Sequence, residues 1–491
     1  MKKFLLIWLV CLGPFAGAAA PPSFENDFLD KTLRIDFYQT GDASDTIVTI
    51  DQMYEQGIWA GNPNTLIDTL NRGAYTVKLV DINTNRVIFT RGFSTIFEEY
   101  QTTEPAKSGL KRTFHESLLV PFPKRPCLFI IEARNKLNLL TPIFTTRIDP
   151  EDVSIIREHA HTQDQIVTAL HSGPAHHKVD LVFVAEGYTV DESDKFAEDV
   201  RRFTDALFEV EPFGSNRSKF NVSGVLRPSA QSGVDEPTRG SFKNTVLGAS
   251  YNALDTPRYL LRNDNRAMRD IAQAVPYDYV LVLANTSRYG GGGIYNNYTI
   301  FTADDRRSEV IMIHEFGHGF ANLADEYFGN VAYTDYFPAG VEPYPPNITA
   351  LLDPNHVKWA HLLTPGIPIP TPWGQDEIDA LRRRIDAEKQ SHDSRMAALK
   401  QADASPGDLP GDNESLEMEH RQLTEVLQEE IRQIQAKYTA LYQGKIGVFE
   451  GAGYTAKGLY RSEIHIGMFH DGQFGPVSEE AVQGIINHLT Q

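Results

Sequence analysis

The chain of 491 residues is acidic, with 46 lysines and arginines against 65 aspartates and glutamates and a formal net charge of −19. This excess of negative charge argues against nucleic acid or an anionic membrane as a partner. Hydrophobic residues make up 41% and charged residues 23%, which is typical of a globular protein. The length allows two or three domains, each large enough to bury its own core.

The first residues have the pattern of a secretory signal peptide. Two lysines precede an apolar run from Phe4 to about Leu12, and Ala16-Gly17-Ala18 offers a cleavage site. We therefore expect residues 1–18 to be removed and the mature protein to be exported, to a periplasm or to the extracellular space. The apolar run is too short to cross a bilayer, so no membrane span is expected. Cys127 would then be the only cysteine of the mature chain, which excludes an intrachain disulfide.

Residues 19–150 predict an all-β, sandwich-like domain. Their apolar runs are separated by turn residues and show no helical period of any length. The predicted strands cover residues 33–38, 75–81, 86–92 and 127–133. We expect this domain to pack against the rest of the chain or to recruit a substrate, without chemistry of its own.

From residue 151 onward the pattern changes to alternating strands and helices, which predicts an α/β domain over residues 151–491. Residues 179–185 form a nearly continuous apolar run, as a buried strand requires. Residues 191–210 have helical spacing, and further strands are predicted at 219–226, 277–284 and 297–303. This order, with a helix to follow, matches the zincin-like plan of a twisted sheet behind one active-site helix.

Four consecutive glycines, residues 290–293, precede the last of these strands. Glycine lets another backbone approach closely, so Gly291, Gly292 and Gly293 are candidate substrate-binding residues on an edge strand that pairs with a peptide. The alternative is a flexible hairpin or bulge without a ligand.

The run HEFGHGFANLADEY, residues 314–327, carries the main chemical signal. His314 and His318 are four residues apart, so on a helix they share one face and can bind one Zn²⁺. Glu315 lies between them, where its carboxylate can act as general base toward a zinc-bound water. The apolar residues before His314 predict a buried helix with Ser308 as its N-cap.

A third ligand must come from beyond the helix. Gly319 and Asn322 allow the helix to end, and the first carboxylates after that point are Asp325 and Glu326. Asp325 is the first choice as metal ligand and Glu326 is the alternative. Either carboxylate could instead orient a ligand histidine.

The residues around this helix resemble the igalysin family of IgA-type zinc metallopeptidases. The family motif continues from His-Glu-x-x-His into Leu-Ala-Asp-Glu-Tyr, which are residues 323–327 here. Further stretches that resemble the family are residues 179–189, 201–213, 289–298 and 449–461. With the β-rich front segment, the resemblance covers the mature chain except for a charged insert near 375–440. The family name implies an immunoglobulin substrate, which no residue here identifies.

The insert itself predicts a helical hairpin. Residues 375–442 contain two charged segments with apolar residues at helical spacing, separated by a loop rich in glycine and proline. We expect its charges to form a solvated face, and partner binding is the alternative.

The closing segment supplies candidates for the floor and the rim of the site. Met468 resembles the methionine turn beneath the zinc of metzincins, although it would look the same as plain core. Tyr327, Tyr460, His465 and His470 are all candidates to stabilise an oxyanion, and the sequence does not choose among them.

These observations predict a secreted zinc-dependent endopeptidase that acts on a protein or peptide substrate. The substrate could be a glycoprotein or an immunoglobulin-like protein, and the oligomeric state is not predicted. An exopeptidase would need a charged pocket for a free chain end, and no such cluster stands beside the motif. A different class of protein is also possible, namely a non-catalytic zinc-containing glycoprotein-binding protein. Glu315 weighs against it, because a structural zinc site needs no base.

Overall fold

The structure is a computed structural model that describes residues 21–157, 164–328, 336–402, 411–465, 468 and 473–491. The signal peptide expected at residues 1–18 and the oxyanion candidate His470 lie outside the described residues. Within the described part of the chain, no helix is both long and apolar enough to cross a membrane.

The N-terminal region consists mainly of two antiparallel sheets. One has the order β2-β1-β5 and the other β4-β3-β6-β7. Their bounds are β1 Phe28–Gly41, β2 Thr46–Gln56, β3 Tyr75–Asp81, β4 Arg86–Phe93, β5 Arg112–Pro123, β6 Cys127–Arg134 and β7 Leu140–Ile148. Alternate residues of both sheets, such as Leu33, Ile35, Val77 and Leu79, share one buried core. All four strands predicted in this region are confirmed.

Three short helices in the same region were not expected from the sequence. They are α1 (Phe24–Asp27), α2 (Ile96–Gln101) and α3 (Glu104–Lys107). None is longer than six residues, which is too short to display a helical period. Of the three, α2 matters most for function because it borders the candidate site.

A six-stranded sheet forms the centre of the second region, with the order β12-β13-β11-β9-β10-β8. Its strands are β8 Gln165–Leu170, β9 Val179–Glu186, β10 Phe220–Leu226, β11 Tyr279–Ala284, β12 Gly291–Ile294 and β13 Tyr298–Thr302. The four inner strands are parallel, and the two edge strands are antiparallel to their neighbours. Every residue of β9 is buried, which explains its continuous apolar run.

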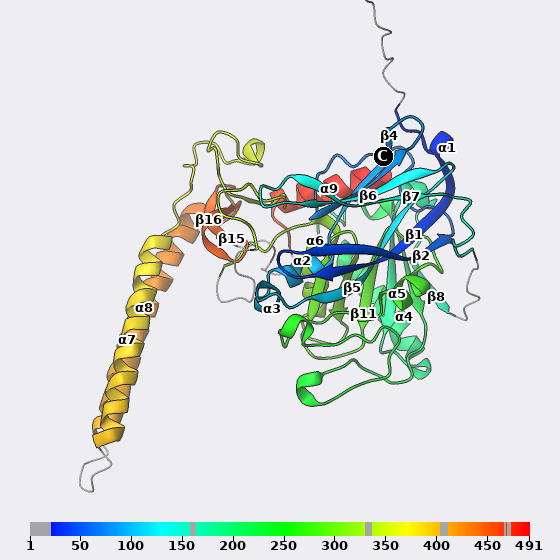
Figure 1. Cartoon of the computed structure of the whole chain (residues 1–491). Helices are drawn as coiled ribbons and strands as arrows, with labels where there is room; N and C mark the ends of the chain where they lie inside the picture. The colour runs from blue at the N-terminus through cyan, green and yellow to red at the C-terminus, as the bar shows by residue number, and fades with distance from the viewer. Residues whose placement is uncertain (1–20, 158–163, 329–335, 403–410, 466–467, 469–472) are drawn as a thin grey trace, which may run out of the picture.

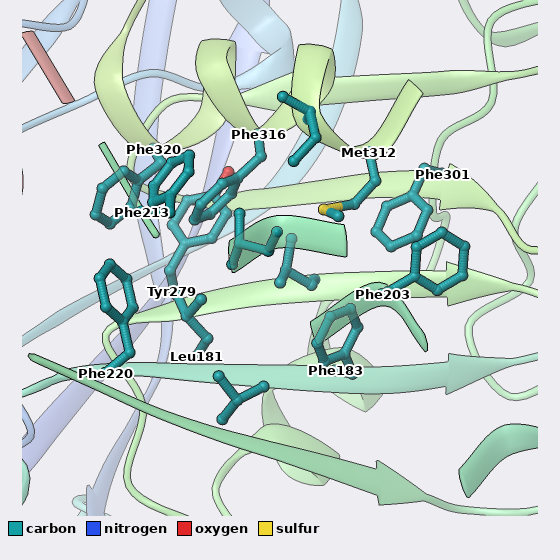
Figure 2. Close-up of a cluster of buried hydrophobic side chains, with 14 of the residues drawn as sticks. Leu181, Phe183, Phe203, Phe213, Phe220, Tyr279, Phe301, Met312, Phe316 and Phe320 are labelled. Carbon is teal, nitrogen blue, oxygen red and sulfur yellow. The ribbon is translucent and has the colours of Figure 1, made fainter. Parts of the chain in front are cut away.

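Helices cover both faces of this sheet. On one face, α4 (Ser193–Phe208), α6 (Ser308–Ala321) and α9 (Pro476–Thr490) pack on side chains such as Leu181 and Phe183. Figure 2 shows Met312, Phe316 and Phe320 of α6 directed toward the strands in this core. On the other face, α5 (Asn265–Ala272) shares a core with alternate strand residues.

The N-terminal region packs directly on this second domain. Ile96 of α2 belongs to the same buried cluster as the α5 face of the sheet. The buried Arg34 of β1 makes an ion pair of 2.5 Å with Asp270 of α5. Ile294 of β12 belongs to the same cluster as Ile96, so α2 lies near the glycine-rich edge of the central sheet.

The remaining elements lie toward the C-terminus. A small sheet has the order β14-β16-β15, with β14 Ile348–Thr349, β15 Phe449–Ala452 and β16 Thr455–Arg461. The predicted hairpin corresponds to α7 (Gln375–Ala402) and α8 (Gly411–Tyr442), which project from the body beside this sheet (Figure 1). Short 3-10 helices lie at Ala175–His177, Val190–Glu192, Arg217–Lys219, Pro237–Arg239, Ala253–Asp255 and Ala360–Leu362.

Candidate functional site

Helix α6 separates a core face from a chemical face. Met312, Phe316 and Phe320 recur every four residues and are buried against the sheet. Each histidine follows one of these core residues by two positions, which corresponds to about 200° around the helix. His314 and His318 therefore point away from the sheet. Their ring centroids lie 4.6 Å apart.

The ends of α6 confirm one prediction and contradict another. The helix ends with Ala321, and Asn322 follows as its C-cap with a left-handed φ of 54°, so the predicted end of the helix at Asn322 is confirmed. Ser308 is the first helical residue and not the N-cap, because residues 305–308 already form a turn in which the Ser308 N–H donates to the Asp305 carbonyl. Arg307 occupies the N-cap position.

Beyond the helix, the chain turns back and brings Asp325 to the two histidines. The Nε2 atoms of His314 and His318 are 3.1 Å apart, and Oδ1 of Asp325 lies 3.5 Å from each. The edge of a tetrahedron of nitrogen and oxygen donors around Zn²⁺ is about 3.4 Å, given bonds of about 2.1 Å. The three atoms therefore have the spacing of three ligands on one zinc ion.

The hydrogen bonds behind this triangle explain why it suits a cation. His314 Nδ1 donates to the Met468 carbonyl at 2.8 Å, and His318 Nδ1 donates to the Leu323 carbonyl at 2.6 Å. In neutral imidazoles this leaves both Nε2 atoms as acceptors. Oδ1 of Asp325 is buried and accepts no hydrogen bond from the described residues. Three acceptor atoms thus face one another, which a metal ion would satisfy.

The pKa values of the two histidines diverge. Burial, together with the charge on His318, lowers the pKa of His314 to about 4. Burial also opposes the charged form of His318, but the adjacent Asp325 outweighs it and raises the pKa of His318 to about 9. Asp325 itself, although buried, has its pKa lowered by His318. With this pKa, His318 binds a proton beside the ionised Asp325 near neutral pH, and a divalent cation would displace that proton and leave both imidazoles neutral.

Glu326 points away from this triangle. Its Oε1 accepts a hydrogen bond of 3.2 Å from Asn347, and burial raises the pKa of its carboxyl to about 7. Asp325 and not Glu326 is therefore the carboxylate beside the histidines.

Glu315 adjoins the same group. Its carboxylate and the ligand atoms of His314 and His318 lie within 4.8 Å of one another, a wider cluster than the triangle with Asp325. Burial raises the pKa of Glu315 to about 7. A carboxyl group with this pKa can both accept and donate a proton near neutral pH.

The three predicted substrate-binding glycines line the cavity in front of the histidines. A Cβ on Gly291 would lie 2.9 Å from Glu315 Cγ, and one on Gly293 only 2.1 Å from the Glu315 carbonyl oxygen. A Cβ on Gly292 would lie 2.8 Å from the ring of Tyr259. Glycine is thus required at these three positions so that α6 and Tyr259 can pack close to β12, whether or not a substrate binds there.

The chain contacts the outer edge of β12 at Gly291, and contacts Tyr295 directly after the strand. Tyr259 forms an isolated parallel bridge with Gly291, and the Ser94 N–H donates to the Tyr295 carbonyl at 2.9 Å. Ser94, Thr95, Glu98 and Glu99 also line the cavity. The N-terminal region, for which no part in the chemistry was expected, therefore supplies one wall of the site.

The four oxyanion candidates have different positions. Tyr327 lines the cavity. Tyr460 faces Glu450 at 3.5 Å, and His465 is exposed; neither is among the cavity-lining residues. His470 is not described. Tyr327 is thus the candidate that the structure brings to the site.

Met468 lies beneath the histidine helix. Its sulfur would be 3.1 Å from a Cβ on Gly317, and its carbonyl accepts the hydrogen bond from His314. Met468 therefore both packs under α6 and orients a candidate ligand.

Several residues of the site were missed in the sequence. Tyr454 donates to Asp325 Oδ2 at 2.5 Å and was not among the candidate residues. Glu98, Arg258 and Tyr336 line the cavity from distant parts of the chain. Isolated tyrosines and charges carry no periodic signal, so only the folded chain reveals them.

Comparison with models of protein families gives two matches. Residues 167–486 match the IgA Peptidase M64 family, and residues 23–145 match the Peptidase M64 N-terminus family. No curated protein matches the chain. The first match contains the histidine helix, Asp325 and Tyr454, and covers more than half of the chain. The resemblance to igalysins is confirmed, and the chain belongs to the IgA peptidase M64 family.

Proposed function

We propose that the chain is an exported zinc-dependent endopeptidase with a zincin-like catalytic domain over residues 151–491. The observation that carries this proposal is the triangle of His314 Nε2, His318 Nε2 and Asp325 Oδ1, with Glu315 beside it. Membership in a peptidase family supports the reaction class. Export rests on the signal-peptide pattern of residues 1–18.

His314, His318 and Asp325 would hold the zinc. When bound, Zn²⁺ supplies a Lewis acid that polarises the scissile carbonyl and makes a water molecule more acidic. Two nitrogens and one carboxylate oxygen are a common donor set for catalytic zinc, which keeps a fourth position open.

Glu315 is the proposed general base. It takes a proton from the attacking water and later delivers that proton to the leaving amine. Its pKa of about 7, raised by burial, suits both steps. Tyr327 lines the cavity and is the proposed donor to the oxygen on which negative charge develops.

A peptide substrate would lie in the cavity between β12 and α2. Gly291, Gly292 and Gly293 line one side of this cavity, and their backbone is the proposed pairing edge for an extended chain. A protein with an accessible extended segment, such as a glycoprotein or an immunoglobulin-like protein, is the proposed substrate class.

The test compares the wild-type protein with Glu315→Gln on a panel of glycoproteins, with and without a chelator. We expect cleavage by the wild type, loss of cleavage with chelator and recovery on adding Zn²⁺. Glu315→Gln should retain zinc yet turn over at least about 100-fold more slowly, because that is what a positioned base contributes. Glu309→Gln is the matched control, since Glu309 is exposed in the first turn of the same helix. Undiminished turnover by Glu315→Gln would refute the mechanism.

A further inference from the structure

Arg258 stands out among the residues of the catalytic cavity. Of the described residues that line this cavity, it is the only lysine or arginine. Its side chain is exposed, and its guanidinium makes no hydrogen bond or ion pair with any described residue. The cavity thus contains a cation that no described group neutralises by direct contact.

The backbone fixes Arg258 close to the reacting groups. Its neighbour Tyr259 is bridged to Gly291, and paired strands lie about 4.8 Å apart. A Cβ on Gly290 would lie 3.2 Å from the Arg258 carbonyl oxygen. On its other side, Gly291 touches Glu315. Gly291 thus lies between the segment that carries Arg258 and the proposed base Glu315, and that segment is about one strand spacing from Gly291.

Apart from Glu315, the proposed base, the acidic residues of the cavity accept hydrogen bonds from tyrosines. Glu98 accepts hydrogen bonds from Tyr336 and Tyr344, and Glu99 accepts one from Tyr259. Asp325 accepts one from Tyr454. Glu98, Glu99 and Asp325 are thus held by the chain's own donors, and Arg258 remains available to an anionic group of a ligand.

The phenol of Tyr289 also indicates that Arg258 lies near Glu315. Burial raises its pKa, the charge of Glu315 raises it further, and the charge of Arg258 lowers it. One cavity side chain therefore lies within electrostatic range of both Glu315 and Arg258.

We infer that Arg258 binds a carboxylate of the substrate next to the scissile bond. An arginine guanidinium presents a planar pair of N–H donors that matches a carboxylate. The carboxylate can be an aspartate or glutamate side chain, or the free C-terminus of a peptide. This inference rests on the proposed peptidase function and assigns a specificity-determining residue to the same site.

Two measurements test the inference. The first incubates the wild type, Arg258→Gln and Arg258→Glu with pairs of peptides that carry Asp or Asn, or Glu or Gln, at each position around the scissile bond. Each peptide is made with a free and with an amidated C-terminus. The second measures binding without turnover, by incubating Glu315→Gln and Glu315→Gln/Arg258→Gln with a random peptide pool and sequencing the retained fraction by mass spectrometry.

The wild type should prefer a carboxylate over the matching amide by about ten-fold in kcat/KM, the scale of one charge-assisted contact near solvent. Arg258→Gln should lose this preference, so that the acidic peptide and its matching amide are cleaved at equal rates, and Arg258→Glu should prefer a lysine or arginine at the same position. Dependence on a free C-terminus would identify an exopeptidase, and preference for an internal acid an endopeptidase.

Arg306→Gln is the control, because Arg306 is an exposed arginine of the same domain that does not line the cavity. It should leave the preference intact. The inference is overturned if the retained pool lacks acidic enrichment, or if Arg258→Gln leaves the preference unchanged. If no peptide is cleaved but acidic peptides are enriched through Arg258, the peptidase proposal fails and the carboxylate site stands.

Discussion

The phenol of Tyr454 donates a hydrogen bond of 2.5 Å to Oδ2 of Asp325, while Oδ1 of the same carboxylate faces the two histidines. Two backbone bonds reinforce the contact, because Gly453 N–H donates to the Asp325 carbonyl and Tyr454 N–H to the Tyr327 carbonyl. Tyr454 has a φ of 67°, in the left-handed region. A turn more than a hundred residues away thus fixes the orientation of the candidate third ligand.

Removing this phenol should weaken metal binding. We expect Tyr454→Phe to lower the affinity for Zn²⁺ by about 10- to 100-fold, which is the usual effect of losing a partner that orients a ligand. The measurement is competition with a chromogenic chelator. Tyr460→Phe is the control, because Tyr460 faces Glu450 and does not line the cavity. Equal affinities in Tyr454→Phe and wild type would contradict the orienting role.

Asp325 and Glu326 should respond differently to amide substitution. Asp325→Asn replaces an anionic oxygen 3.5 Å from both histidines, so most of the bound zinc should be lost on dialysis. Glu326→Gln should retain zinc, because Glu326 points to Asn347. Elemental analysis distinguishes the two outcomes. Loss of zinc from Glu326→Gln alone would move the ligand to Glu326, and retention in both variants would require a ligand from elsewhere.

The elements that the sequence predicted are those whose apolar residues follow a regular strand or helix pattern. The buried run at 179–185 lies within β9, and the spacing at 191–210 corresponds to α4. The four-residue spacing of His314 and His318 gave their common face because a regular helix fixes it. Short or irregular segments gave no such signal, as α2 with its six residues illustrates.

The walls of the site depend on contacts between distant segments. Arg258, Glu98 and Tyr454 meet around the histidines only after the N-terminal region has packed on the sheet and the chain has returned from the hairpin. The sequence suggested that glycines 291–293 serve a peptide ligand. Their contacts with Glu315 and Tyr259 give them a packing role that no single-sequence pattern could reveal.

Arg72 connects the N-terminal region to the histidine helix. It is 7% exposed, and its guanidinium donates to the carbonyls of Ala321, the last residue of α6, and of Ala481 in α9. Arg72→Met would leave both carbonyls without this donor. We expect a loss of about 1–3 kcal/mol in the free energy of unfolding, seen as a lower Tm.

The control for this loss is Arg147→Met, since Arg147 is exposed and pairs with the partly exposed Asp149. It should change the Tm little, because exposed ion pairs contribute little. A Tm of Arg72→Met equal to or above that of the wild type would mean that the cost of burying this guanidinium outweighs its two hydrogen bonds.

Asp180, at the start of β9, should make stability depend on pH. Its carboxyl is buried, and burial, followed by repulsion from Asp278, raises its pKa above the ordinary value of 3.8. The folded state therefore holds this proton more firmly than the unfolded state, and the free energy of unfolding falls as pH rises from about 4 through the raised pKa. Asp180→Asn cannot ionise, and its amide oxygen can still accept the hydrogen bond that Asn221 donates to Oδ1 at 2.9 Å.

The Tm of Asp180→Asn relative to the wild type should thus be higher at pH 8 than at pH 5. Glu198→Gln, an exposed change on α4, should show no such trend. A constant difference in Tm between Asp180→Asn and wild type across this range would mean that Asp180 keeps the same pKa in both states.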